Sequence, residues 1–290
     1  MKEPILLDGA MGTELNNRGI DTPLPLWSAD ANLKNPEVIR DIHNDYIKAG
    51  SKIIVTNTFR TTLWTYKKAG FSDKQSKELS RASLYSAVDL AHKAARDGVK
   101  IAGSITSIDD CYLPENFPGI PVAEETYGYL IEWLYDAGID ILLFETMGNI
   151  NEIKCALNIA EAYRSPKWLS IIMKNQHSIL DGTPLKSLFK DISSYQLECL
   201  FTNCNNLETT IQNIRQIKIG WDGLVGAYPN LGLMNYQNNY HKTMDHSSFT
   251  SGLMKLLNMN LDYIGLCCGS TPEYISRLNK LIQNNKVIKL

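Results

Sequence analysis

The sequence has no long uninterrupted apolar stretch. No run of apolar residues approaches the roughly 18 that a membrane-spanning helix requires. The short apolar stretch near the N-terminus already ends at Asp8, which is too early for the apolar part of a secretion signal. We therefore expect a cytoplasmic protein that does not enter a membrane.

The sequence also lacks an excess of charge of either sign. Its 29 Lys and Arg residues nearly balance 31 Asp and Glu residues, which leaves a formal net charge of -2. Binding to nucleic acid or to an anionic membrane surface depends on a basic excess that this composition does not have. The expected partners are therefore small-molecule substrates, with no nucleic acid and no membrane among them.

Cysteine is sparse, and the usual histidine motifs for metal binding are missing. Six cysteines in 290 residues are too few for a fold that disulfides stabilise. None of the five histidines has the HExxH spacing or a similar one, so we expect them on the surface or in loops.

Short apolar runs alternate with helix-like patterns along the whole chain. Most of the runs are continuous, which is typical of parallel strands that are buried on both faces. The predicted strands are 5–8, 52–56, 100–104, 140–145, 168–173, 198–202, 223–227 and 262–266. The predicted helices are 36–49, 73–96, 123–137, 151–163, 185–192, 207–217, 247–257 and 272–283.

Eight strand–helix units predict an α/β fold, a single (β/α)8 TIM barrel. An open doubly wound sheet uses the same units, but the sequence has no glycine-rich dinucleotide-binding fingerprint. No linker or low-complexity tract divides the chain, so we expect one domain over residues 1–290. The Asn-rich stretch 235–239 is expected to be a surface loop.

Three of the six cysteines follow the carboxyl ends of predicted strands, where barrel enzymes have their active sites. Cys204 follows the sixth strand, and the adjacent pair Cys267 and Cys268 follows the eighth. Three thiolates at one mouth fit a soft metal such as Zn²⁺, although ordinary buried thiols give the same pattern. The other three are expected to be packing residues: Cys111, Cys155 and Cys199.

A set of three cysteine ligands also indicates a type of chemistry. Three protein ligands leave the fourth tetrahedral position open, as in catalytic zinc sites. Three thiolates make zinc a poor Lewis acid for producing hydroxide, but they suit it to holding an incoming thiol as a thiolate. The predicted chemistry is therefore alkyl transfer to sulfur. A zinc hydrolase, the alternative, would use His or carboxylate ligands and a general base beside the metal.

Several short segments, in this order along the chain, resemble the homocysteine S-methyltransferase family. They cover the chain from Leu6 to about Leu278, and the ordered set with both cysteine motifs is specific. The segments are LLDGAMGTEL from Leu6, TNTF from Thr56, FETM from Phe144, DGTPL from Asp181, the pair Asn203-Cys204, YPN from Tyr228 and CCGSTPEYI from Cys267.

The resemblance implies a zinc-dependent barrel enzyme that transfers a methyl group to homocysteine and forms methionine. By the motifs, Cys204, Cys267 and Cys268 would be the zinc ligands, and the thiolate of homocysteine would take the fourth position. Asp8 and Glu145 would hold the α-ammonium group of the substrate, since both are acidic and both stand at strand ends.

Three further residues are candidates for the substrate site. By resemblance, Asn230 would take the fourth zinc position when substrate is absent, and Thr56 and Asn57 would line the pocket. Structural alternatives remain for all of these positions. The alternative for Asp8 and Glu145 is a cap or a structural ion pair, Asn230 fits a turn equally well, and the alternative for the other two is hydrogen bonding of the strand end.

The favoured methyl donors are sulfonium compounds, S-methylmethionine or S-adenosylmethionine. We expect the chain to lack both a cobalamin domain and the C-terminal extension of betaine-dependent enzymes. The alternative donors are betaine and methyl-cobalamin on a separate protein. The alternative function is that of a zinc-binding regulatory protein without turnover.

The sequence departs from the family pattern at three places near the expected site. Leu266 and Thr202 stand where glycine is typical, and the segment 104–119 is shorter than usual. These departures bear on donor choice or on activity, and a bulky Leu266 would narrow the pocket. His177, after the fifth strand, is a minor candidate for contact with the donor.

Overall fold

The computed structural model describes residues 3–235 and 240–287. Within this part, one sheet consists of the following parallel strands: β1 (Ile5–Leu6), β2 (Ile53–Val55), β3 (Lys100–Ile105), β4 (Ile141–Met147), β5 (Lys167–Ile171), β8 (Leu197–Asn206), β9 (Leu224–Asn230) and β12 (Tyr263–Ile264).

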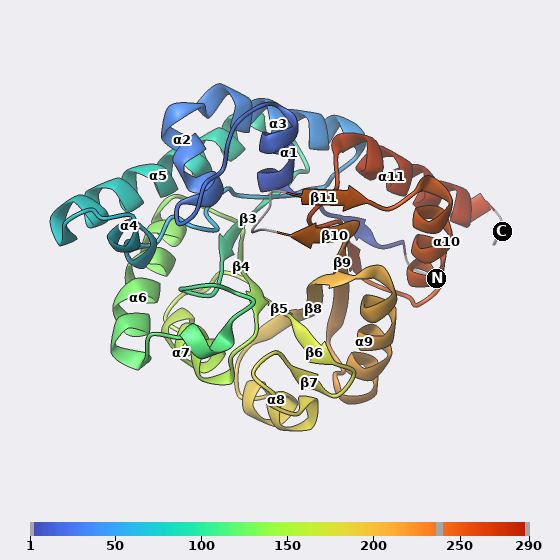
Figure 1. Ribbon diagram of the computed structural model, residues 1–290. Coiled ribbons are helices and arrows are strands. Elements are labelled where there is room, and N and C mark those ends of the chain that lie inside the picture. Colours follow the sequence, from blue (N-terminus) through green and yellow to red (C-terminus); the bar gives the residue numbers. More distant parts are fainter. Residues whose placement is uncertain (1–2, 236–239, 288–290) are drawn as a thin grey trace.

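The sheet closes on itself. Its strands follow the order β1–β12–β9–β8–β5–β4–β3–β2. A parallel bridge between Leu7 and Ile53 joins the two outer strands, and the Lys52 N–H donates to the Leu6 carbonyl at 2.8 Å. The fold is therefore a (β/α)8 barrel with an outer ring of helices, as the sequence predicts and Figure 1 shows.

The outer ring contains a helix in each of the predicted helical segments. These helices are α3 (Pro36–Ala49), α5 (Asp73–Ala94), α6 (Ile120–Asp136), α7 (Ile150–Ala160), α8 (Leu185–Ile192), α9 (Leu207–Gly220), α10 (His246–Leu257) and α11 (Pro272–Val287). Shorter helices lie in the connections: α1 (Met11–Asn17), η1 (Trp27–Asp30), α2 (Ala31–Lys34), α4 (Leu63–Lys68) and η2 (Pro114–Asn116).

Local sequence signals explain where several helices begin and end. At the start of α5, the Ser72 hydroxyl accepts from the Gln75 N–H while the Gln75 side chain accepts from the Ser72 N–H, which is a capping box. Gly50 ends α3 with a φ of 119°, a left-handed conformation that glycine adopts without steric cost.

The predicted strand 168–173 is wrong at its end. β5 stops at Ile171, and Met173 starts a separate hairpin of β6 (Met173–Asn175) and β7 (Ser178–Ile179) outside the barrel. The continuous apolar run of this segment hides the break, because Ile172 and Met173 are also buried.

A second hairpin follows β9. β10 (Gly232–Asn235) pairs antiparallel with β11 (Tyr240–Thr243), where the sequence predicts only a connection with a surface loop at 235–239. Asn235 therefore belongs to a strand, and residues 236–239 lie outside the described part of the chain.

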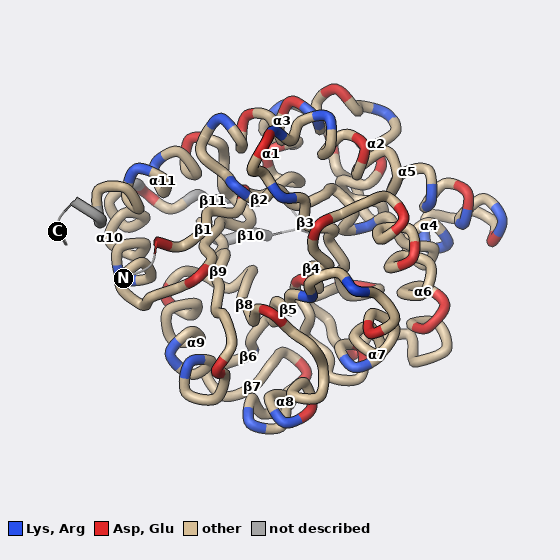
Figure 2. Tube along the Cα trace, turned by 180° about the vertical axis from the view of Figure 1, so that it is seen from behind, with Lys and Arg blue, Asp and Glu red and all other residues tan. Residues whose placement is uncertain are grey.

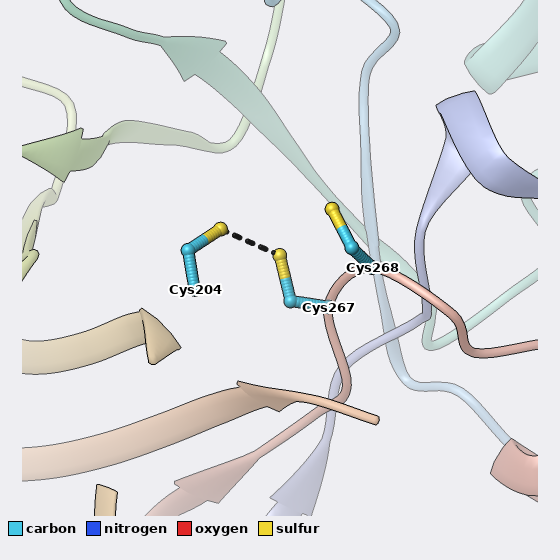
Figure 3. A group of neighbouring side chains, drawn as sticks. All are labelled: Cys204, Cys267 and Cys268. Carbon is cyan, nitrogen blue, oxygen red and sulfur yellow. Dashed lines mark hydrogen bonds between the residues drawn. The ribbon is translucent and has the colours of Figure 1, made fainter. Parts of the chain in front are cut away.

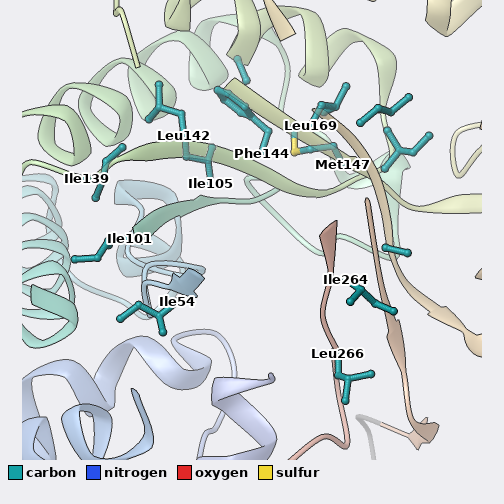
Figure 4. Packing of buried hydrophobic residues seen from close by; sticks show 14 of the residues in the cluster. Ile54, Ile101, Ile105, Ile139, Leu142, Phe144, Met147, Leu169, Ile264 and Leu266 are labelled. Carbon is teal, nitrogen blue, oxygen red and sulfur yellow. The ribbon is translucent and has the colours of Figure 1, made fainter. Parts of the chain in front are cut away.

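Two apolar layers hold the barrel together. The outer layer packs the strands against the helices through residues such as Ile54, Leu142 and Phe144, which Figure 4 shows. The inner layer fills the barrel with Trp168 and its aromatic neighbours, whose ring centroids lie 4.4–5.7 Å apart. Alternate residues of a strand face these two layers, which explains the continuous apolar runs.

Charged side chains of both signs are interspersed on the outer helices, while the barrel strands are largely uncharged (Figure 2). Among the described residues, no helix combines the length and the apolar character needed to cross a membrane.

His43 is an unusual residue in the outer layer. It lies on α3 with no exposed surface, and neither ring nitrogen has a hydrogen-bond partner among the described residues. Burial lowers the pKa of His43 from 6.5 to about 4. Since the unfolded chain then binds the proton more readily below pH 6.5, His43 destabilises the folded state as the pH falls from 6.5 toward 4.

We predict that His43→Leu removes about 2 kcal/mol of the stability loss that the wild type shows between pH 7.5 and 5.0. Urea unfolding of both proteins at each pH, with a chelator present throughout, measures this difference. His92→Gln, a change at an exposed histidine, is the control and should leave the pH dependence unchanged. An identical pH dependence of the wild type and His43→Leu would contradict the prediction.

Candidate metal and substrate site

A cavity of about 180 Å³ opens at the carboxyl ends of the barrel strands. Of the eight predicted site residues, seven line it: Asp8, Thr56, Asn57, Glu145, Cys204, Cys267 and Cys268. The eighth, Asn230, lies beside the cavity and donates from Nδ2 to the Cys204 carbonyl at 2.8 Å. The structure therefore brings together residues that are up to 260 positions apart in sequence (268 minus 8).

The three cysteine sulfurs form a compact group on one wall of the cavity. All three Sγ atoms lie within 4.8 Å of one another, and those of Cys204 and Cys267 are 2.8 Å apart (Figure 3). Gly269 follows the pair with a φ of 87°, and this left-handed turn lets the adjacent cysteines present both sulfurs to the same space. The structure thus brings together the three cysteines that the sequence places at one mouth.

The chemistry of this group fits a thiophilic divalent ion such as zinc. Zinc binds thiolates at about 2.3 Å in a tetrahedron, which separates neighbouring sulfurs by a little under 4 Å. None of the three cysteines forms a disulfide. The hydrogen bonds from its sulfur neighbours, together with burial, raise the pKa of the Cys267 thiol well above its usual value. A cation bound at this group would favour the thiolate form of these side chains.

Asn230 supplies an additional acceptor at this wall. Its Nδ2 donates a hydrogen bond to the Cys204 carbonyl, while its buried Oδ1 has no hydrogen-bond partner among the described residues. An orphaned buried oxygen next to a thiol cluster fits a site that has a further partner to bind.

Two buried carboxyl groups face the same cavity. Asp8 accepts from the Val55 N–H at 2.9 Å, and burial raises the pKa of Asp8 well above its usual range. Burial likewise raises the pKa of Glu145 from 4.5 to about 7, although Ser104 and Tyr228 donate hydrogen bonds to it. Both groups are acids that this environment leaves short of positive charge.

No basic side chain of the described residues forms an ion pair with Asp8 or Glu145. Arg60 is the one basic residue among those that line the cavity, and its Nη1 donates to the Asp109 carbonyl at 2.7 Å. A structural ion pair, the alternative for both acids, is therefore wrong for this part of the chain. The pair of carboxyl groups is instead suited to a cationic group that enters with a ligand.

The polar side-chain atoms of Thr56 and Asn57 are hydrogen-bonded within the connections after β1 and β2. The Thr56 hydroxyl shares a 2.8 Å hydrogen bond with Thr58, and the Asn57 Nδ2 donates to the Ser28 carbonyl and to Asn32, each at 2.8 Å. Both residues therefore shape the cavity wall while their polar atoms are engaged in the fold.

The segment 104–119 forms another wall of the cavity, which the sequence does not predict in detail. Glu152 on α7 accepts from the Ile108 N–H at 2.7 Å, and the Asp109 carboxylate accepts from Trp64 at 2.7 Å. These anchors turn the next residues toward the cavity: Asp110, Cys111 and Tyr112.

Cys111 has two properties at once. It is buried like Cys155 and Cys199, as predicted for a packing residue, but it also lines the cavity. Leu266 lines the cavity as well and is buried, so its side chain takes up space at this wall. His177 is exposed at the turn of the β6–β7 hairpin and is not among the lining residues.

Further lining residues come from the connections after β1 and β2 and from β4 itself. The sequence gives no chemical signal for them beyond their positions near strand ends. They are Trp27, Phe59, Arg60 and Thr146.

Comparison with known proteins identifies relatives over nearly the whole chain. The family model described as homocysteine S-methyltransferase matches residues 5–282. The homocysteine S-methyltransferase of Escherichia coli (strain K12) is 30% identical, with 94% of each chain covered. The selenocysteine methyltransferase of Astragalus bisulcatus is 25% identical, with 97% of this chain and 93% of the relative covered.

A solved structure agrees with these matches. The metallated form of the homocysteine methyltransferase MmuM from Escherichia coli superimposes with a TM-score of 0.83 at 28% identity, covering 96% of both chains. The oxidized form of the same protein gives the same TM-score and identity.

We predict that changing Cys204, Cys267 or Cys268 to Ser lowers the zinc content of the purified protein from one ion per chain to well below half. Elemental analysis after dialysis against trace zinc measures the content. Cys111→Ser is the matched control, because it alters a thiol in the same cavity that does not belong to the sulfur group. Full zinc content in any of the three variants, or loss of zinc in the control, would contradict the assignment.

Proposed function

Because the chain belongs to the homocysteine S-methyltransferase family, we propose that it transfers a methyl group from a sulfonium donor to the sulfur of homocysteine and forms methionine. The donor would be S-methylmethionine or S-adenosylmethionine, and the reaction would depend on zinc. One observation carries this proposal: a group of three cysteine sulfurs shares a single cavity with two buried carboxyl groups that form no ion pair within the described part of the chain.

The two halves of this arrangement match the two ends of homocysteine. Zinc held by Cys204, Cys267 and Cys268 would favour the thiolate form of the substrate, because a free alkyl thiol such as that of cysteine, with a pKa of about 8.5, is mostly protonated at neutral pH. Asp8 and Glu145 would bind the α-ammonium group. Its positive charge would offset the negative charge of these carboxylates, which burial makes unfavourable. The substrate would thus be fixed at both ends, and its sulfur would be oriented for attack on the methyl group.

The remaining wall of the cavity supports a cationic donor. Trp27, Phe59 and Tyr112 line the cavity together with Asp110. Aromatic faces and a carboxylate both attract a positively charged sulfonium group. Methyl transfer converts that group to a neutral thioether, which has less affinity for such a wall and leaves it. The small volume of the cavity also favours exclusion of water from the reacting sulfur.

The test of the proposal is methionine formation by the purified zinc-loaded protein with homocysteine and each donor in turn. We expect product with S-methylmethionine or S-adenosylmethionine, and none with betaine or methyl-cobalamin. Cys268→Ala should lose both its zinc and its activity. Stoichiometric zinc without turnover of any donor would instead indicate a regulatory zinc-binding protein, and activity of Cys268→Ala without zinc would exclude the mechanism.

Glu145 should make homocysteine binding depend on pH. With a pKa of about 7, this carboxyl group becomes protonated below neutral pH and loses its attraction for the ammonium group. We predict that the KM of Glu145→Gln for homocysteine is already high at pH 7.5. Between pH 7.5 and 6.0, the KM of the wild type should rise by a factor roughly ten times larger than the KM of this variant does.

Steady-state kinetics at saturating donor over this pH range measures the difference between the two proteins. The comparison cancels the pH dependence of the substrate thiol, which both proteins share. Glu198→Gln is the control. Glu198 lies near the start of β8, at the other end of that strand from Cys204, and this variant should follow the wild type. Parallel KM profiles for wild type and Glu145→Gln would rule out this role of Glu145.

A further inference from the structure

Asn203 is a fully buried amide directly before Cys204, and its orientation is fixed by its partners. Its Oδ1 accepts from the Thr146 N–H at 3.1 Å and from the Ser170 hydroxyl at 2.7 Å. Because a backbone N–H can only donate, the atom facing it must be the amide oxygen. The Nδ2 group of Asn203 therefore points the other way, toward the sulfur wall of the cavity.

Two hydrogen-bond donors converge on the Cys204 sulfur. The Asn203 Nδ2 lies 3.4 Å from Sγ and also donates to the Thr146 hydroxyl oxygen at 2.8 Å. The Thr146 Oγ1 is 3.8 Å from the same sulfur. Since that oxygen already accepts from Asn203, its hydrogen is left for the sulfur, and a thiolate can only accept it.

The backbone at both positions has a conformation that non-glycine residues seldom adopt. Thr146 has a φ of 58° and Cys204 a φ of 54°. For a β-branched residue such as threonine this conformation is sterically unfavourable, so the surrounding contacts must hold it. The hydrogen bonds between Thr146 and Asn203 tie the strained Thr146 to the residue directly before the strained Cys204.

We infer that Asn203 and Thr146 are positioning residues that hold the Cys204 sulfur as a metal ligand and reduce its negative charge. Three thiolates around one zinc ion leave a net negative charge, which the thiolate of the substrate increases. Hydrogen bonds from a neutral amide and a hydroxyl offset part of that charge without adding a competing cation. This inference rests on the proposed function in one respect, namely that the site binds zinc.

The test measures metal binding in the purified protein without any turnover. Zinc affinity is obtained by competition with a chromophoric chelator for the wild type, Thr146→Val, Thr146→Ser and Asn203→Leu. We expect Thr146→Val and Asn203→Leu to bind zinc about 10- to 100-fold more weakly. Thr146→Ser keeps the hydroxyl group and should retain the affinity of the wild type.

Thr210→Val is the matched control. Thr210 is as buried as Thr146, and its hydroxyl donates to the Asn206 carbonyl at 2.9 Å rather than to a sulfur. The same chemical change there should leave the zinc affinity unchanged. If Asn203→Leu does not fold, the comparison of the three threonine variants still decides the question.

A spectroscopic measurement separates a role at the sulfur from a general effect on stability. In the cobalt-loaded protein, loss of a donor raises the energy of the sulfur lone pairs, so the sulfur-to-cobalt charge-transfer band of Thr146→Val should move to longer wavelength. Thr146→Ser and Thr210→Val should leave the band in place.

Unchanged zinc affinity and an unchanged band in Thr146→Val would overturn the inference, as would equal losses in Thr146→Val and Thr210→Val. Failure of the wild type itself to bind zinc would contradict the proposed function. Zinc binding by the wild type with no change in Thr146→Val would contradict only the inference about Asn203 and Thr146.

Discussion

The mouth of this barrel depends on how buried negative charge is offset. Three thiols and two carboxyl groups share a small cavity, and burial raises the pKa of Asp8 and Glu145 because the charged forms lose their hydration. The one basic residue that lines the cavity, Arg60, forms no ion pair with either acid among the described residues. In the proposed function, positive charge comes from outside the chain: a metal ion at the sulfurs and an ammonium group at the acids.

The interior of the barrel makes the floor of this cavity apolar. Trp168, Phe201 and Tyr263 fill the barrel below it with closely packed rings. Tyr228 connects the two regions, since its ring lies 5.7 Å from that of Phe201 while its hydroxyl donates to Glu145 at 3.4 Å. The apolar floor keeps water from solvating the carboxyl groups from below. Their charged forms are therefore stabilised chiefly by a cationic ligand.

Much of the fold and site is predictable from sequence because it depends on local patterns. Parallel strands buried on both faces give continuous apolar runs, and the carboxyl ends of such strands necessarily meet, so Cys204 and Cys267 can be expected to converge. The β6–β7 and β10–β11 hairpins are missed because their short strands contain polar residues and lack the continuous apolar runs that mark the barrel strands. The wall formed by 104–119 depends on Glu152 and other distant anchors, which no local pattern encodes.

The hydrogen bonds around Cys204 could not be predicted because they depend on irregular backbone. In a regular strand, consecutive side chains face opposite sides, so β4 could direct only one of Glu145 and Thr146 toward the cavity. The register of β4 shifts between Phe144 and Met147, and that of β8 shifts between Asn203 and Asn206. Each irregularity contains one residue with a positive φ.

The two irregular strands therefore use the same device. Each bulge turns two consecutive side chains toward the site, as bulges near active sites commonly do. β4 presents Glu145 to the cavity and Thr146 to the Cys204 sulfur, while β8 presents that sulfur and the Asn203 amide that orients it. Because Thr146 and Asn203 bond to each other, neither strand can relax to a regular form without moving the other. These hydrogen bonds thus couple β4, which carries Glu145, to β8, which carries Cys204.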